Sequence, residues 1–371
     1  MLQRPLTFLL KMRLLRQNKS VRTRLSGYNK KERQVSMIIV FGAAGFVGSY
    51  LLEELPTKSY LAVDAKRCIG KKKVVCLDIT KPNIFAHLPT SGVECVVNLA
   101  SLQPDYVRQE DFDPVKYLQV NTIGAINIAK YCINNNIPKM IHVISHRSVI
   151  ETYDAIGSKD SPITESDPVT FSYGDEFAEF AISEMAAVQN LYCYRQKKGL
   201  NTVILRIPAV FGYGPHLEGY QNGQYKKTGF QTFIEAALSK KPICIWGDPS
   251  VGRDIIYVKD VVSAIMAAVR VEQVYGIYNI ASGQLLALEE EVKEIINVFS
   301  PNASKHTISY DPSRPNGIKP CLYSIAKARR DLNWWPKYSF REMLLDYRKE
   351  WHQGRFDYLV EGRKEVVDVG T

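Results

Sequence analysis

Short apolar runs alternate with stretches of helical periodicity along the first half of the chain. Each run holds four or five residues, which is too few for a helix and is typical of a buried strand. The runs predict strands at residues 38–41, 60–63, 74–77, 95–99, 140–144 and 202–205. Helical spacing predicts helices at residues 49–55, 113–136 and 175–198. Strands separated by helices in this way indicate an α/β fold with a doubly wound parallel sheet.

Three glycines follow the first predicted strand and precede the first predicted helix. They are Gly42, Gly45 and Gly48. Glycine permits a tight turn and lets the backbone approach a ligand closely, because it has no side chain. The start of the helix offers N–H groups and the positive end of a dipole, which suit a pyrophosphate. The strand, turn and helix start together predict a dinucleotide site.

An acidic residue follows the second predicted strand. Asp64 lies 22 residues after Gly42, where a carboxylate can accept both hydroxyls of an adenosine ribose, as expected for NAD. Lys66 and Arg67 keep NADP open, since a base there would meet a 2′-phosphate. Asp64 would repel that phosphate, so NAD is the first choice.

Ligands of doubly wound sheets bind beyond the carboxyl ends of the strands. One continuous cleft is expected there, and the residues at those ends are Gly42, Asp64, Asp78, Ala100 and Ser145. After Arg206 the alternation of elements changes. A Gly-, Tyr-, Asn- and Gln-rich stretch at 212–229 predicts a loop on the substrate side.

Beyond this loop we expect helices at 231–239, 260–271 and 288–299 and strands at 243–246 and 254–258. They would form a smaller C-terminal α/β lobe that binds the substrate. Four parts are therefore expected: a basic leader at 1–36, an NAD-binding Rossmann domain at 37–211 with a sheet return near 254–260, a mainly substrate-binding lobe at 212–351, and a tail at 352–371.

The formal net charge of +10 belongs almost entirely to the leader. Residues 1–36 hold ten Lys or Arg and one Glu, so the rest of the chain carries about +1. Three interpretations of the leader stay open: translation from a start upstream of Met37, a targeting or membrane-surface segment, and a nucleic-acid arm. The balanced charge of the folded part gives no support to nucleic-acid binding.

Seven cysteines are scattered along the chain without a Cys-x-x-Cys pair. This argues against a disulfide framework and against a zinc site, and it indicates reduced thiols in a cytoplasmic protein. No apolar run approaches the ~20 residues that span a bilayer, so no transmembrane segment is expected.

A set of short motifs follows the glycine turn in a definite order. They are Leu77-Asp78-Ile79, Asn98-Leu99-Ala100, residues 205–212, Trp246-Gly247-Asp248, residues 253–260, Tyr278-Asn279-Ile280, Arg314-Pro315 and residues 332–336. In this order they make the chain resemble the extended short-chain dehydrogenase/reductases. Within that group it is similar to the NAD-dependent epimerase/dehydratase family, which acts on nucleotide sugars. The resemblance runs from Met37 to about Trp351.

The resemblance implies NAD as the cofactor, a nucleotide sugar as the substrate and a possible homodimer. The implied cofactor contacts are Gly42, Gly45, Phe46, Val47, Gly48, Asp64, Asp78, Ile79, Leu99, Ala100 and Asn121. Arg253 and Arg314 are candidates to bind the diphosphate, because a guanidinium is a planar, permanently charged fork. The alternative for each is an ordinary surface or salt-bridged arginine, and we prefer the binding role for Arg253. Tyr257 belongs to the same motif as Arg253 and is a further substrate candidate.

The catalytic motif departs from the family pattern. The family carries Tyr-x-x-x-Lys on the long helix, and counting back from Arg206 places Phe180 and Glu184 at those positions. Phenylalanine cannot exchange a proton, and a glutamate cannot lower the pKa of a tyrosine as a lysine does. Tyr173 lies seven residues earlier, in a register that supplies no lysine. The Ser or Thr that the family places after the preceding strand falls on His146.

His146 and Glu184 are the candidates for proton exchange, because imidazole titrates near neutrality and a carboxylate can accept hydrogen bonds from the cofactor ribose. A histidine that is only hydrogen-bonded at a strand end is the equal alternative.

Arg147 and Ser148 stand where a sugar dehydratase would carry its acid and base, which argues against dehydration. Two functions stay open: an NAD-dependent nucleotide-sugar epimerase or oxidoreductase that uses transient hydride transfer, and a catalytically silent protein that binds NAD and a nucleotide sugar for sensing or scaffolding.

Overall fold

A computed structural model describes residues 37–65, 68–69, 72–104, 107, 112–149, 157–171, 173–174, 177–215, 218–221, 224–300 and 307–360. The chain separates into two compact units, residues 1–36 and residues 37–371. The predictions for the leader and for Lys66 and Arg67 fall outside the described residues.

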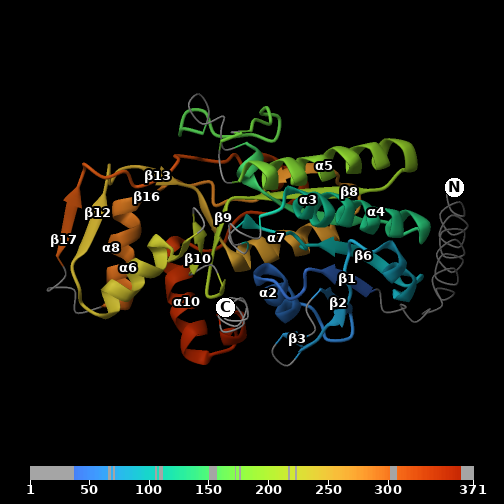
Figure 1. Ribbon diagram of the computed structural model, residues 1–371, viewed down its shortest axis with the longest axis horizontal. Helices are drawn as coiled ribbons and strands as arrows, with labels where there is room; N and C mark the ends of the chain where they lie inside the picture. Colours follow the sequence, from blue (N-terminus) through green and yellow to red (C-terminus); the bar gives the residue numbers. More distant parts are fainter. Residues whose placement is uncertain are drawn as a thin grey trace, which may run out of the picture. The chain divides into compact units, whose positions relative to one another are not determined.

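A seven-stranded parallel sheet forms the centre of the second unit (Figure 1). Its strand order is β15-β8-β7-β6-β1-β2-β5. The strands are β1 (Met37–Phe41), β2 (Tyr60–Asp64), β5 (Val75–Cys76), β6 (Val93–Asn98), β7 (Met140–Ser145), β8 (Thr202–Ile207) and β15 (Gly276–Asn279). The prediction of a doubly wound parallel sheet is therefore confirmed. The order reverses between β1 and β6, and such a switch point is where ligands bind in open sheets.

Helices cover both faces of this sheet (Figure 1). α2 (Phe46–Glu54) and α7 (Val258–Arg270) lie on one face, and α4 (Ala125–Asn134) and α5 (Ala178–Lys198) lie on the other.

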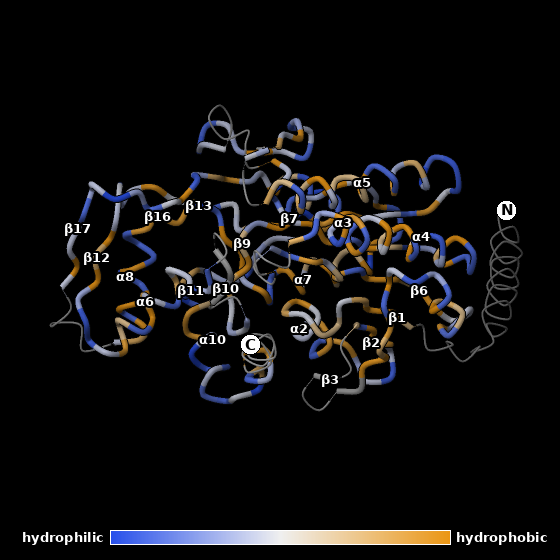
Figure 2. Tube along the Cα trace, viewed as in Figure 1, coloured by the Kyte–Doolittle hydropathy of each residue, from blue (hydrophilic) through white to orange (hydrophobic). Residues whose placement is uncertain are grey.

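The side chains of β1 divide between the two faces. Ile38 and Val40 belong to the apolar cluster with α2 and α7, whereas Ile39 and Phe41 belong to the cluster with α4. Successive side chains of a strand point to opposite faces, so an unbroken apolar run is what a strand covered on both faces needs. Figure 2 shows hydrophobic positions along the central strands.

The helix predicted at 113–136 is divided into three segments. α3 (Pro114–Tyr117) is followed by the π-helical segment η4 (Leu118–Gly124) and then by α4. Within η4, the Asn121 side chain donates to Ser183 Oγ of α5 (2.9 Å), and the Thr122 hydroxyl donates to the Ser183 carbonyl (2.7 Å). The hydrophobic period cannot reveal this change of pitch, because it is enforced by polar contacts with a helix far away in the sequence.

The strand that returns to the large sheet differs from the prediction. Residues 255–257 do form a strand, β14 (Ile255–Tyr257), but it pairs with β9 (Ala209–Phe211) in a separate two-stranded sheet. The returning strand is β15, which pairs with β8. β14 leads directly into α7, and the crossover through this helix brings the chain back to the free edge of β8.

The other described elements form small sheets and helices. The paired strands are β3 (Cys68–Ile69) with β4 (Lys72–Lys73), β10 (Glu218–Gln221) with β11 (Gln224–Lys227), β12 (Ile243–Trp246) with β17 (Ile308–Asp311), and β13 (Gly252–Arg253) with β16 (Leu286–Ala287). The remaining helices are η1 (Pro82–His87), η5 (His146–Ser148), α6 (Gly229–Leu238), α8 (Leu288–Phe299), α9 (Ala326–Leu332) and α10 (Phe340–Gln353). Part of the loop predicted at 212–229 is thus a hairpin, and the domain division near residue 211 stays a prediction.

Candidate active site

Close contacts in the turn after β1 require glycine at two of the three positions. Gly42 has φ +74°, and a Cβ there would lie 2.5 Å from the amide nitrogen of Ala100. A Cβ on Gly48 would lie 2.4 Å from the carbonyl oxygen of Gly42. These neighbours are backbone atoms and cannot turn away. The turn therefore brings the end of β1, the start of α2 and the end of β6 together.

The start of α2 is suited to an anion. Gly45 is its N-cap and is exposed, and no side chain caps the helix. The N–H groups of a first helical turn, here including Val47 and Gly48, have no partner inside the helix and carry the positive end of its dipole. The Phe46 ring packs edge-on against Tyr50 (5.5 Å between centroids), so only the backbone of Phe46 faces the turn. These features fit the pyrophosphate of a dinucleotide.

The Asp64 carboxylate lies directly beside the glycine turn. Its Oδ2 accepts a hydrogen bond from the Ala44 N–H (2.9 Å). The bond fixes the end of β2 against the turn that precedes α2. This places the carboxylate where the sequence predicts the ribose of an adenosine.

The next segment predicted to hold the cofactor is Asp78-Ile79. Asp78 Oδ1 accepts from the N–H (3.0 Å) and the hydroxyl (2.8 Å) of Thr80. The carbonyl of Ile79 accepts from the Asn127 side chain of α4 (2.9 Å). The Ile79 side chain packs over Gly124, where a Cβ would lie 2.5 Å from it. α4 therefore fixes the conformation of this segment.

The Leu99-Ala100 segment after β6 is fixed by two asparagine side chains. Asn98 Oδ1 accepts from the Ala100 N–H (3.1 Å). Asn121 Oδ1 accepts from the Leu102 N–H (2.7 Å), and its Nδ2 donates to the Leu102 carbonyl (3.1 Å). Asn121 is buried, and both ends of its amide bond to the protein. It therefore shapes the predicted cofactor segment, and a direct contact with the cofactor stays a prediction.

Glu184 joins three segments at the carboxyl end of the sheet. Its Oε2 accepts from the Ser145 N–H at the end of β7 (3.0 Å), and its Oε1 lies 3.5 Å from the hydroxyl of Ser101, which follows β6. Only 5% of Glu184 is exposed. Burial raises the pKa of its carboxyl to about 8, although the bonds from Ser145 and Ser101 act in the opposite direction. Glu184 is therefore a buried carboxyl group that holds its proton more tightly than an ordinary glutamate does.

Phe180 lies one turn before Glu184 on α5 and is only 2% exposed. Its ring contacts the Tyr117 ring edge-on, with the centroids 6.5 Å apart. The position at which the family carries its tyrosine is thus part of the apolar packing here. Tyr173, the alternative tyrosine, lies before α5 begins and is 83% exposed.

His146 lies at the end of β7, one residue after Ser145, and is buried. Its Nδ1 lies 2.6 Å from the hydroxyl of Tyr323. Sequence reasoning missed Tyr323, because it lies 177 residues away and belongs to none of the motifs. Burial lowers the pKa of His146 well below its ordinary value, and Arg147, Arg206 and Arg253 add to this effect.

Arg253 lies on β13, and its guanidinium forms a long ion pair with a carboxylate. Its Nη2 is 3.6 Å from Oε2 of the buried Glu291 in α8, and its guanidinium lies 5.7 Å from the centroid of the Phe211 ring. Both Arg253 Nε and Glu291 Oε1 are buried without a hydrogen-bond partner. Burial raises the pKa of Glu291, while Arg253 acts to lower it. Arg253 therefore has unused hydrogen-bonding capacity for an anion.

Arg314 follows β17 and is largely exposed. Its Nε lies 3.2 Å from Asp311 Oδ2, and its guanidinium lies 5.0 Å from the centroid of the Trp246 ring. An exposed pair of this kind is weak and can exchange its carboxylate for another anion.

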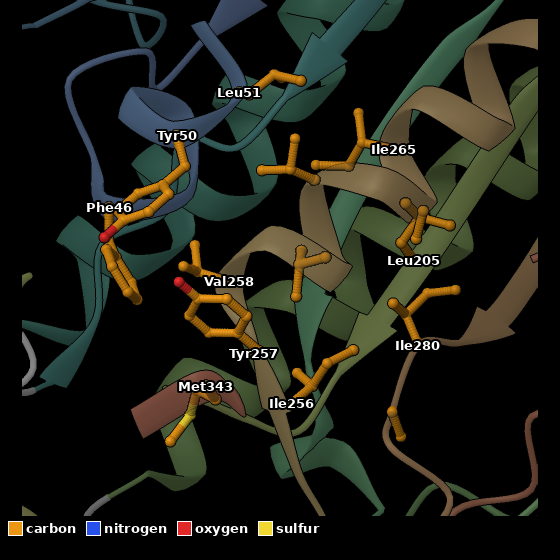
Figure 3. Packing of buried hydrophobic residues seen from close by; sticks show 14 of the residues in the cluster. Phe46, Tyr50, Leu51, Leu205, Ile256, Tyr257, Val258, Ile265, Ile280 and Met343 are labelled. Carbon is orange, nitrogen blue, oxygen red and sulfur yellow. The ribbon is translucent and has the colours of Figure 1, made fainter. Parts of the chain in front are cut away.

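Tyr257 is placed in the core, which argues against its predicted contact with the substrate. It is 3% exposed, and its hydroxyl donates to Asp346 of α10. Figure 3 shows its ring among apolar side chains that include Val258 and Met343. The phenol faces inward: β14 continues directly into α7, and Asp346, which accepts from the Tyr257 hydroxyl, belongs to α10. We therefore leave Tyr257 out of the candidate site.

A continuous series of contacts links most of the predicted site residues. It runs from Asp64 through the glycine turn to Ala100, and from Ser101 through Glu184 to Ser145 and His146. Among the described residues, no group of three or more His, Cys, Asp or Glu side chains is arranged to hold a metal ion. None of the described helices is long and apolar enough to cross a membrane.

Known proteins resemble this chain over most of its length. The chain is 25% identical over 320 residues to a putative UDP-glucose 4-epimerase of Methanocaldococcus jannaschii, and the match covers 82% of this chain and 95% of the relative. The fold resembles the UDP-glucose 4-epimerase of Thermotoga maritima, solved with UDP-glucose, with a TM-score of 0.67, 21% identity and coverage of 85% and 98% of the two chains. It also resembles the Thermus thermophilus UDP-glucose 4-epimerase solved with NAD, with a TM-score of 0.65, 22% identity and coverage of 85% and 99%.

A family model matches residues 38–281, which include the glycine turn, Glu184, His146 and Arg253. This range is well over half of the chain and contains six of the seven strands of the large sheet in full, together with most of β1. The chain therefore belongs to the NAD-dependent epimerase/dehydratase family.

Proposed function

We propose that this protein is an NAD-dependent nucleotide-sugar epimerase or oxidoreductase that works without the tyrosine and lysine usual in its family. The observation that carries the proposal is the glycine turn, whose uncapped helix start lies beside the Asp64 carboxylate. This arrangement fits NAD, because Asp64 can accept the ribose hydroxyls and would repel the 2′-phosphate of NADP. The solved relatives contain UDP-glucose or NAD, which supports the same pair of ligands here.

Glu184 is the group that we propose for proton exchange. When bound, NAD would accept a hydride from a sugar carbon and return it. The hydroxyl on that carbon must release its proton as the carbonyl forms and regain it when the hydride returns, and the ionised Glu184 carboxylate would accept and return this proton. His146 directly follows Ser145, whose N–H donates to Glu184. Because Phe180 cannot exchange a proton, it has no role in this step.

Arg253 and Arg314 are proposed to bind the diphosphate of the sugar nucleotide. The buried Nε of Arg253 lacks a hydrogen-bond partner, and Arg314, itself largely exposed, is paired with the partly exposed carboxylate of Asp311. Both lie in the part of the chain that we propose as the substrate lobe, residues 212–351. A homodimer and a cytoplasmic location stay predictions that accompany this function.

The test begins with the full-length chain purified under native conditions. We expect its native mass to include bound NAD, and a screen of UDP-, GDP- and dTDP-sugars to find one that is converted. Arg253→Ala should weaken binding of that sugar nucleotide roughly tenfold or more and leave NAD binding unchanged. Arg270→Ala, an exposed arginine at the end of α7, is the matched control.

Three results separate the alternatives. A protein that binds both ligands and shows no hydride exchange would be the catalytically silent binder, for which the comparisons give no specific support. A protein that binds neither NAD nor any sugar nucleotide would refute the proposed function. Equal losses from Arg253→Ala and Arg270→Ala would remove Arg253 from the site.

A further inference from the structure

Tyr323 lies in the distant C-terminal part of the chain, 177 residues after His146, and its side chain contacts the histidine. Its hydroxyl oxygen lies 2.6 Å from His146 Nδ1, and the two rings meet edge-to-face with centroids 5.8 Å apart. Both residues are buried. The proton exchange proposed for Glu184 does not use this contact, so the proposed function does not explain why the two side chains meet.

The backbone around Tyr323 is held on two sides. The Ile163 N–H donates to the Leu322 carbonyl, and the Ser324 N–H donates to the Ile163 carbonyl, both at 2.8 Å. On the other side, the Tyr323 N–H donates to Asp254 Oδ2 (3.3 Å). The phenol therefore reaches His146 from a backbone whose position is fixed independently of the histidine.

The charges around His146 are mainly positive. Arg147 is its neighbour on η5, Arg206 comes from β8 and Arg253 comes from β13, and all three disfavour a second proton on the ring. Glu184 of α5 bonds to the residue before His146. Burial and the three arginines lower the pKa of His146 well below its ordinary value, so the imidazole is neutral at neutral pH and carries one ring hydrogen.

The position of that hydrogen follows from the relative basicity of the two partners. A neutral imidazole nitrogen is a much better acceptor than a phenol oxygen, whereas the phenol hydroxyl is a good donor. The Tyr323 hydroxyl therefore donates to Nδ1, and the ring hydrogen resides on Nε2.

We propose that Tyr323 is a positioning residue that holds His146 in the Nε2–H tautomer, so that the histidine serves as a hydrogen-bond donor and Glu184 alone exchanges the proton. The role in the reaction rests on the function proposed above, whereas the tautomer does not.

The tautomer can be measured by nitrogen NMR on the full-length chain with ¹⁵N-labelled histidine. His146→Gln identifies the resonances of His146 among the six histidines. We expect wild-type His146 to show a hydrogen on Nε2 and a bare Nδ1, without titration between pH 6 and 8. A hydrogen on Nδ1, or a doubly protonated ring at pH 7, would overturn the proposal.

Tyr323→Phe removes the donor and keeps the ring. We expect it to mix the two tautomers of His146, while Tyr278→Phe leaves them unchanged. Tyr278 is a suitable control because it is equally buried, at 2%, and its hydroxyl bonds to Asp331. An unchanged single tautomer in Tyr323→Phe would show that Tyr323 does not set it.

Once a substrate is known, kcat provides an independent reading. Tyr323→Phe should lower kcat about tenfold, equivalent to about 1.4 kcal/mol, with KM little changed. An unchanged kcat would remove Tyr323 from the reaction. If no sugar nucleotide binds, the proposed function fails, and the NMR result still decides whether Tyr323 sets the tautomer.

Discussion

The cofactor side and the catalytic side of this site are built in different ways. On the cofactor side, Gly42, Gly48 and Asp64 lie within one stretch of chain and meet through backbone contacts. On the catalytic side, Glu184 and His146 obtain their properties from partners 39 to 177 residues away. The glycine turn is thus present in a member of the family in which Phe180 and Glu184 stand in place of the usual catalytic tyrosine and lysine. The dinucleotide site and the chemistry are separable properties of the fold.

The largest expected effect tests how rigid the cofactor side is. Gly42→Ala should lower the free energy of unfolding by more than about 5 kcal/mol, because it combines a left-handed backbone with a 2.5 Å clash against Ala100. Gly92→Ala is the matched control: its φ is also +74°, but nothing lies within 4 Å of the added Cβ. It should cost only about 1 kcal/mol. Urea unfolding of the two variants measures the difference, and equal costs would mean that the close approach is unimportant.

The second prediction concerns the buried carboxyl on the catalytic side. The pKa of Glu184 rises to about 8 in the folded protein, so its stabilising contribution is complete below about pH 4.5 and is lost as the pH rises towards 8. Across this window the loss should be about 3 to 5 kcal/mol. Glutamine does not ionise, so Glu184→Gln should become more stable relative to wild type as the pH rises. Urea unfolding at several pH values measures this difference in the free energy of unfolding. Glu179→Gln on the same helix is the control, and parallel curves for Glu184→Gln and wild type would contradict the buried state of this carboxyl.

The third prediction asks whether the catalytic side can be returned to the family pattern. Phe180→Tyr should lower the free energy of unfolding by about 2 kcal/mol, because it adds a hydroxyl to a side chain that is 2% exposed and packed on Tyr117. It should not raise turnover, since Glu184 remains in place of the lysine. A gain in kcat from Phe180→Tyr alone would show that the two sides are less distinct than we propose. The double variant Phe180→Tyr, Glu184→Lys, which restores both family residues, is measured in the same turnover assay.

The smallest effect is expected for Asp64→Asn. The amide oxygen can still accept from the Ala44 N–H, so the fold should be unaffected. Loss of the charge should weaken NAD binding about tenfold, or about 1.4 kcal/mol, and should reduce the preference for NAD over NADP. Calorimetric titration with both cofactors measures this, and an unchanged preference would mean that Asp64 does not select the cofactor.

Much of the fold could be predicted because the relevant signals are local. β1 is buried on both faces and reads as an unbroken apolar run, and Gly199 ends α5 in the left-handed conformation, with φ +71°. β15 could not be predicted, because only Ile277 and Tyr278 among its four residues are apolar, which is too short a run to indicate a strand. The π-helical segment depends on Thr122 contacting Ser183, which is a tertiary contact.

The candidate site shows the same limit. The geometry of the glycine turn and Asp64 agrees with the positions that the sequence predicts, whereas their roles in binding stay predictions. Sequence reasoning named His146 but could not give its pKa direction or find Tyr323, since both depend on which segments meet at the end of β7. It could not show that Tyr257 is buried, because a motif does not reveal whether a tyrosine faces solvent or the core.

The long-range contact between His146 and Tyr323 also bears on the order in which the protein is made. A ribosome adds about 5 to 20 residues per second, so the 177 residues between them separate their synthesis by roughly 10 to 35 seconds. During that interval the nascent chain already contains the complete glycine turn and Asp64, while Tyr323, whose hydroxyl contacts His146, has not yet been synthesised. The two sides of the site therefore mature at different times, and the catalytic side is completed last.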